Sequence, residues 1–116
     1  MAEANAPVLT ALNYLFSHEG DATVAHCLDL DLVTSGATLA EAEEALNAMV
    51  RYQIRSCFLA GRWSQLRRRA PSEFWHIREQ AKKLDQGELE IEVPPIILPI
   101  SRKLNLPVVR SERPAA

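Results

Sequence analysis

The stretch that decides the fold is Ala25-His26-Cys27-Leu28-Asp29-Leu30-Asp31-Leu32-Val33, closely followed by Gly36-Ala37-Thr38-Leu39-Ala40-Glu41-Ala42. The first part alternates along much of its length, which is typical of a strand. In the second part, the Thr38 hydroxyl can cap the amide of Glu41, while the Glu41 carboxylate reaches back to the amide of Thr38, closing a capping box. Gly36 supplies the freedom in φ that a tight turn needs. This junction predicts the change from sheet to helix.

The residues upstream of the junction predict a hairpin. Positions 8–17 alternate, His18-Glu19-Gly20-Asp21 form a turn, and positions 22–28 resume in residues that favour strands. We expect strands near 9–16 and 23–28 to pair.

The segment after the hairpin allows two interpretations. Leu28, Leu30 and Leu32 alternate with Asp29 and Asp31. Either both aspartates face water from an amphipathic strand, or they bracket a turn that leads into a short third strand at 32–35. In both cases we expect an antiparallel meander.

Beyond Thr38 the apolar residues recur with the period of a helix, from about residue 39 to residue 59. Acidic residues crowd its first turns and basic residues its last, as the helix dipole favours, and Gly61 predicts its end. The apolar stripe consists of Leu39, Ala42, Leu46, Met49, Val50, Gln53, Ile54, Cys57 and Phe58. We therefore predict an α+β fold, a three-stranded antiparallel meander with one long helix on one face.

The rest of the chain predicts smaller additions to this core. Residues 61–100 contain a basic connector, a second short helix from about Ser72 to Leu84 and a short edge strand at 89–93, all packed on the core. Residues 101–116 are polar and contain further prolines, so we expect a flexible tail. With a leader at 1–7 and a core at 8–60, the chain forms a single domain.

Composition narrows the class of protein. The chain has 116 residues, 47% of them apolar and 24% charged, which suits one globular domain. A net charge of −2 argues against a protein whose whole surface binds nucleic acid. The N-terminus does not resemble a signal peptide, no run is long enough to span a membrane, and Cys27 and Cys57 are expected as reduced thiols. We expect a cytoplasmic protein.

The residues that could carry chemistry form no catalytic signature. The three histidines and two cysteines lack the spacings that bring ligands to one ion, so we expect neither a metal nor a cofactor. Asp29 and Asp31 share one side of an extended segment and could hold Mg²⁺ or act as an acid and base, but solvated polar positions are the favoured interpretation. We expect a protein without enzymatic activity.

A local basic site is the remaining candidate for nucleic-acid binding. Arg67, Arg68 and Arg69 lie between two tryptophans, Trp63 and Trp75. Basic residues interleaved with aromatic ones can hold a phosphate backbone and stack on bases. We favour the alternative, in which the arginines are solvated and at least one tryptophan packs the second helix onto the sheet.

The segment from Val8 to about Leu59 resembles the HicB-like antitoxin family. The family pattern has two strands around a Gly-containing hairpin, a run of the Ala-x-Cys-x-(Asp/Glu)-Leu type, and Gly-x-Thr-x-x-Glu-Ala opening a helix. Here these elements are Leu9 to Ser17, Glu19-Gly20, Ala25 to Leu30, and Gly36 to Ala42. The resemblance implies part of a double-stranded RNA-binding or RNase H-like domain that binds and inhibits a small ribonuclease toxin, HicA.

The resemblance also suggests an interface for the toxin, and two other functions remain as alternatives. A small basic HicA-like toxin would sit against an acidic surface, and self-association into a homo-oligomer is expected. The family's C-terminal DNA-binding motif finds no counterpart here, because Pro94, Pro95 and Pro99 occupy the place of its first helix. The alternatives are an orphan protein-interaction domain, or a nucleic-acid-binding module that uses Arg67 to Arg69. The residues of the expected acidic interface are Asp29, Asp31, Glu41, Glu43 and Glu44.

Overall fold

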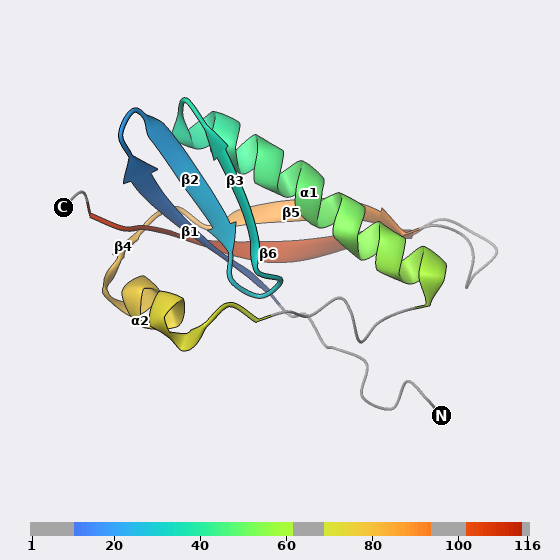
Figure 1. Ribbon diagram of the computed structural model, residues 1–116. Coiled ribbons are helices and arrows are strands. Elements are labelled where there is room, and N and C mark those ends of the chain that lie inside the picture. The colour runs from blue at the N-terminus through green and yellow to red at the C-terminus, as the bar shows by residue number, and fades with distance from the viewer. Residues whose placement is uncertain (1–10, 62–68, 94–101, 115–116) are drawn as a thin grey trace.

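The protein has an α+β fold in which a mixed six-stranded sheet carries two helices (Figure 1). The computed structural model describes residues 11–61, 69–93 and 102–114. The order of the strands in the sheet is β3-β2-β1-β6-β4, and β5 also pairs with β6. The elements are β1 (Leu12–Glu19), β2 (Ala22–Cys27), β3 (Leu32–Gly36), α1 (Leu39–Ala60), α2 (Ser72–Gln80), β4 (Lys82–Lys83), β5 (Gly87–Val93) and β6 (Arg102–Glu112).

The antiparallel meander predicted from the alternating residues is confirmed. β1 pairs with β2 around a turn in which Gly20 has a φ of 60°, a conformation that glycine adopts readily. β2 pairs with β3 from Thr23 opposite Gly36 to Cys27 opposite Leu32. The four residues between β2 and β3 form a turn, so the second interpretation of the Asp29–Asp31 segment is the right one.

The predicted flexible tail at 101–116 is wrong for most of its length. Residues 102–112 form β6, which pairs in parallel with β1 and antiparallel with β5. Leu106 and Val108 of β6 are buried in the core, and this apolar burial holds the strand in place. Pro107 is tolerated because it precedes Val108, where the pairing of β6 with β1 begins.

The long helix α1 covers one face of the sheet, packing on β2, β3 and β5 (Figure 1). Its buried residues confirm most of the predicted stripe and meet side chains of β1, β2, β5 and β6. Met49 differs, because 40% of its side chain is exposed at the border of the stripe. The buried stripe residues are Ala42, Leu46, Val50, Ile54 and Cys57.

The short helix α2 packs on the opposite face of the sheet, where Phe74, Trp75 and Ile77 contact a second cluster that includes Leu15 and Leu28. The helix is shorter than predicted. It ends at Gln80 because Ala81 adopts an extended conformation and leads into β4, where Lys82 and Lys83 pair with β6. The helix therefore covers part of the face of the sheet that α1 leaves open.

The strand predicted at 89–93 is confirmed within β5. Leu89 and Ile91 are buried, while Glu88, Glu90 and Glu92 between them are exposed. This period of two places the apolar residues under α1 and the carboxylates in water.

Candidate functional site

The candidate site is the outer edge of β3. This strand ends the sheet order, and within the part of the chain that the structure describes, no strand pairs with its outer side. Its sequence Leu-Val-Thr-Ser-Gly contains neither a charge nor a proline, the residues that proteins use to protect an edge. Val33 is 52% exposed there. Such an edge can accept a further strand.

The capping box fixes one end of β3, with one difference from the prediction. The backbone N–H of Glu41 donates to the Thr38 hydroxyl at 3.1 Å, as expected. The Glu41 carboxylate, however, accepts from the backbone N–H of Ala37 at 3.3 Å instead of that of Thr38. Glu41 remains exposed at the surface.

Gly36 is needed for space at this junction. A Cβ atom built on it would lie 2.7 Å from the backbone nitrogen of Ala42 and 2.9 Å from the Cβ of Glu41. The expected reason, freedom in φ, is replaced by close approach of the strand end to the first turn of α1.

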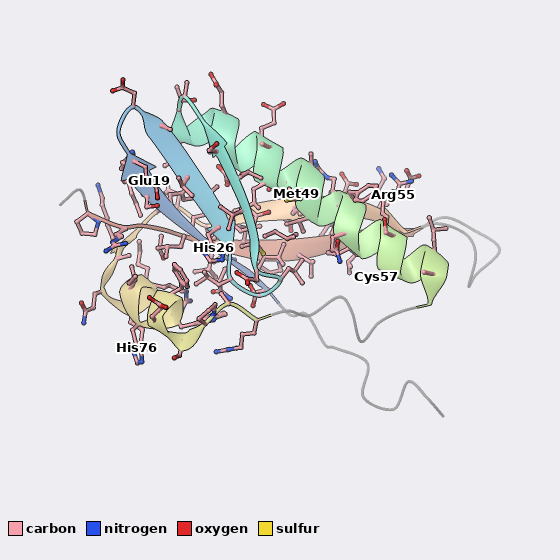
Figure 2. The ribbon with its side chains drawn as sticks, viewed as in Figure 1. Glu19, His26, Met49, Arg55, Cys57 and His76 are labelled. Atoms are coloured by element: carbon pink, nitrogen blue, oxygen red, sulfur yellow. The ribbon has the colours of Figure 1, made fainter. Side chains whose placement is uncertain are left out.

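A hydrogen-bonded pair, His26 and Asp31, marks the other end of β3. Asp31 has a φ of 53°, and its carboxylate lies 2.7 Å from Nε2 of His26. Figure 2 labels His26, which contacts the Phe74 ring edge-on with centroids 4.8 Å apart. His26 is buried, and Asp31 satisfies one of its ring nitrogens.

A hollow of about 390 Å³ lies beside β3, on the face of the sheet opposite α1. Leu15, Val24, Val33, Pro71 and Phe74 provide its apolar surface. Its polar lining consists of Ser17, Glu19, His26, Asp31 and Arg113. The sequence gives no sign of this hollow, because its residues come from β1, β2, β3, the start of α2 and the end of β6. Only the sheet topology brings them together.

The contacts of His26 in the hollow do not match a serine–histidine–aspartate relay. In a serine–histidine–aspartate relay, Nε2 of the histidine takes the proton of the serine. Here Asp31 occupies Nε2 of His26.

Asp29 does not belong to the expected acidic interface. It is buried, and its carboxylate accepts hydrogen bonds from the backbone N–H of Asn13 at 2.6 Å and from the Asn13 side-chain amide at 3.2 Å. The expectation that both aspartates face water therefore fails for Asp29, since its carboxylate satisfies polar groups inside the fold. Asp31 is the one that is exposed.

Glu43 is also engaged inside the protein. Arg110 donates to it from Nε at 2.8 Å and from Nη2 at 2.9 Å, and both side chains are about four-fifths buried. Of the expected interface, Asp31 stands before β3, while Glu41 and Glu44 are exposed beyond its other end. The carboxylates bracket the edge strand and do not form one continuous patch.

The basic connector is only partly described. Arg67, Arg68 and Trp63 lie outside the described residues. Arg69 stacks its guanidinium 4.0 Å from the centroid of the Trp75 ring, and Nε1 of Trp75 donates to the backbone carbonyl of Ala70 at 3.2 Å. Trp75 is therefore committed to packing, as we expected of at least one tryptophan.

Tyr14 and the two cysteines are held in their neutral forms. Burial raises the pKa of the Cys27 thiol to about 12, with a further contribution from the nearby Asp29 charge. Burial also raises the pKa of Tyr14 well above its usual range and that of Cys57 above its usual value. Both cysteines are free and buried, so they are poor nucleophiles.

The described ranges hold neither a cluster of metal ligands nor a membrane-spanning helix. Residues 11–61, 69–93 and 102–114 contain no group of three histidine, cysteine or acidic side chains placed to hold a metal ion. The same ranges contain no helix that is long and apolar enough to cross a membrane.

Comparison with known proteins gives no relative of this chain. No family model, no curated protein and no solved structure matches it.

Proposed function

We propose that this chain is a HicB-like, antitoxin-type protein that binds and neutralises a small basic ribonuclease through the free edge of β3. The order of hairpin, strand, Gly-x-Thr-x-x-Glu-Ala motif and long helix supports the family, together with its partial double-stranded RNA-binding or RNase H-like core. The protein acts by binding, in the cytoplasm, and catalyses no reaction of its own.

The unprotected edge of β3 is the observation that carries this proposal. Backbone N–H and C=O groups along an edge strand pair readily with an extended segment of another protein. Edge strands that avoid such pairing usually carry lysine, proline or a bulge, and β3 has neither lysine nor proline. The edge is thus suited to a protein partner.

The surroundings of β3 favour a basic partner with an apolar side chain. Side chains of an added strand would alternate between the α1 face and the hollow, where Val33 and Phe74 provide apolar contacts. Asp31 at one end and Glu41 and Glu44 beyond the other supply negative charge. Complementary charge raises the rate of association, so binding should weaken as salt rises.

Co-purification with the protein encoded by the neighbouring reading frame tests the proposal. We expect the wild-type chain to retain a small basic neighbour that arrests growth when it is expressed alone. Val33→Lys places a positive charge on the edge and should reduce retention at least tenfold. Tyr52→Glu, a substitution at an exposed residue of α1, should leave retention unchanged.

Two outcomes would overturn the proposal. Recovery of no stable partner, together with a harmless neighbour, would leave the orphan interaction domain. Recovery of RNA that is lost when Arg67, Arg68 and Arg69 are replaced by alanine would move the function to the basic connector.

A further inference from the structure

The outer face of α1 has an apolar stripe that the packing of the fold does not use. Among the residues that the structure describes, five large apolar side chains are exposed, and three of them are on α1. Tyr52 is 73% exposed, Leu59 55% and Met49 40%. Figure 1 shows this helix running along the outside of the molecule.

The exposed residues of α1 follow a regular spacing. Ala45, Ala48, Tyr52, Arg55 and Leu59 are separated by alternating steps of three and four residues, and all five are exposed. Steps of three and four place side chains along one line of a helix, which is the spacing of a helix–helix seam. The two alanines allow a second helix to approach closely, and Tyr52 supplies a large side chain to fill the space opposite them.

The charged residues along this face favour a second copy of the same helix as the partner. Glu41 and Glu44 lie near the start of α1, while Arg55 lies near its end, and all three are exposed. Arg55 is labelled in Figure 2. A second helix of the same sequence in antiparallel orientation would place its basic end beside the acidic start of the first.

We propose that α1 is a self-association surface, on which two copies of this chain pair their outer faces antiparallel about a two-fold axis. The axis passes between Ala48 and Tyr52, so that Tyr52 of each copy covers Ala48 of the other. Arg55 of one copy then lies beside Ala45 of the other, within reach of Glu41 and Glu44. Such an interface is isologous and closes after two copies.

This surface is separate from the β3 edge. In the dimer the two sheets lie on the outside and the two α1 helices between them, so each copy keeps its β3 edge free. The inference therefore does not depend on the proposed function.

Sedimentation equilibrium of the full chain at tens of micromolar tests the inference. We expect a dimer, and Tyr52→Glu should weaken it at least tenfold because the new carboxylate would lie near Glu44. Arg55→Glu should weaken it too, and adding Glu44→Arg should restore association. Val33→Lys is the control, because Val33 is also exposed but lies on β3, and it should leave the dimer unchanged. Circular dichroism should show that every variant keeps its fold.

Disulfide trapping tests the orientation. A mixture of Ala45→Cys and Arg55→Cys chains should form a cross-linked pair on oxidation, whereas Ala45→Cys alone should not, because its two copies would lie about 15 Å apart along the helices. A monomer at these concentrations would overturn the inference. Loss of the dimer in the Val33→Lys variant would also overturn it. So would cross-linking of Ala45→Cys chains with one another.

Discussion

Arg110 binds both carboxylate oxygens of Glu43, which ties the last strand of the sheet to the first turns of α1. The two donor distances are 2.8 and 2.9 Å, and the Arg110 guanidinium also lies 5.7 Å from the Phe16 ring centroid. A third hydrogen bond runs from Nη1 to the carbonyl of Asp85 at 3.1 Å. The pair thus joins segments that are 67 residues apart in the sequence.

Replacing Arg110 by lysine should destabilise the protein by about 1 to 3 kcal/mol. A lysine cannot form the two-pronged contact, and the partly buried Glu43 carboxylate would lose hydrogen bonds to a charged donor. Urea denaturation measures the change. The control is Lys103→Ala, which breaks the exposed pair with Glu90 and should change stability by less than about 0.5 kcal/mol. Equal effects of the two substitutions would contradict the role given to Arg110.

Leu46→Ala should cost about 2 to 5 kcal/mol, because Leu46 is fully buried between α1 and the sheet and its loss leaves a cavity. Thermal or urea unfolding measures this loss of stability. Leu59→Ala makes the same change on the exposed side of the same helix and should have a much smaller effect on the monomer. A small effect at Leu46 would argue against the packing of α1 on the sheet.

Thr38→Ala should lower stability by about 1 kcal/mol through the loss of the hydrogen bond to the backbone N–H of Glu41. Thr38→Ser retains the hydroxyl and should behave like the wild type. Equilibrium unfolding and partner binding should be measured together. If Thr38→Ala kept full stability but lost binding of the partner, the motif would have to be reinterpreted as part of the interface.

Asp29→Ala should destabilise the protein by about 1 to 3 kcal/mol, since it leaves the backbone N–H of Asn13 without its acceptor. Asp31→Ala should cost less, because that carboxylate is on the surface. The two variants are compared by urea unfolding at neutral pH. If both aspartates were solvated, the two variants should lose similar amounts of stability. A nuclease or phosphatase activity abolished by Asp29→Asn would overturn the non-enzymatic function.

Stability should fall in alkali because of Cys27. Burial raises the pKa of this thiol to about 12 in the folded state, whereas the unfolded chain releases the proton near the ordinary pKa of 9.0. Between these values the folded state binds more protons, so the free energy of unfolding decreases with rising pH, by at most about 1.4 kcal/mol per pH unit. The raised pKa of Tyr14 continues the loss at higher pH.

Urea unfolding at intervals from pH 8 to pH 11 measures this slope. Cys27→Ala should be less stable at neutral pH but should show a shallower decrease above pH 9. If the wild type and Cys27→Ala lost stability with pH at the same rate, Cys27 would not be the cause of the loss.

The elements with local patterns follow from the amino-acid sequence alone. The alternation before Gly36, the period of α1, the Thr38 cap and the alternating carboxylates of β5 each depend on neighbours within a few residues, and the structure bears them out. Local patterns predict local structure because a strand or a helix repeats every two or 3.6 residues.

Groups that meet from far along the chain take their roles from the way the chain folds. Residues 102–112 look polar and interrupted, yet they form β6, because β5 pairs with residues 102–108, β1 pairs with residues 108–112, and Leu106 and Val108 are buried in the core that α1 covers. In the sequence Asp29 and Glu43 resemble surface carboxylates. In the structure they accept hydrogen bonds from Asn13 and Arg110 inside the fold. Charge alone does not reveal which carboxylates remain at a surface, since their partners lie 16 and 67 residues away.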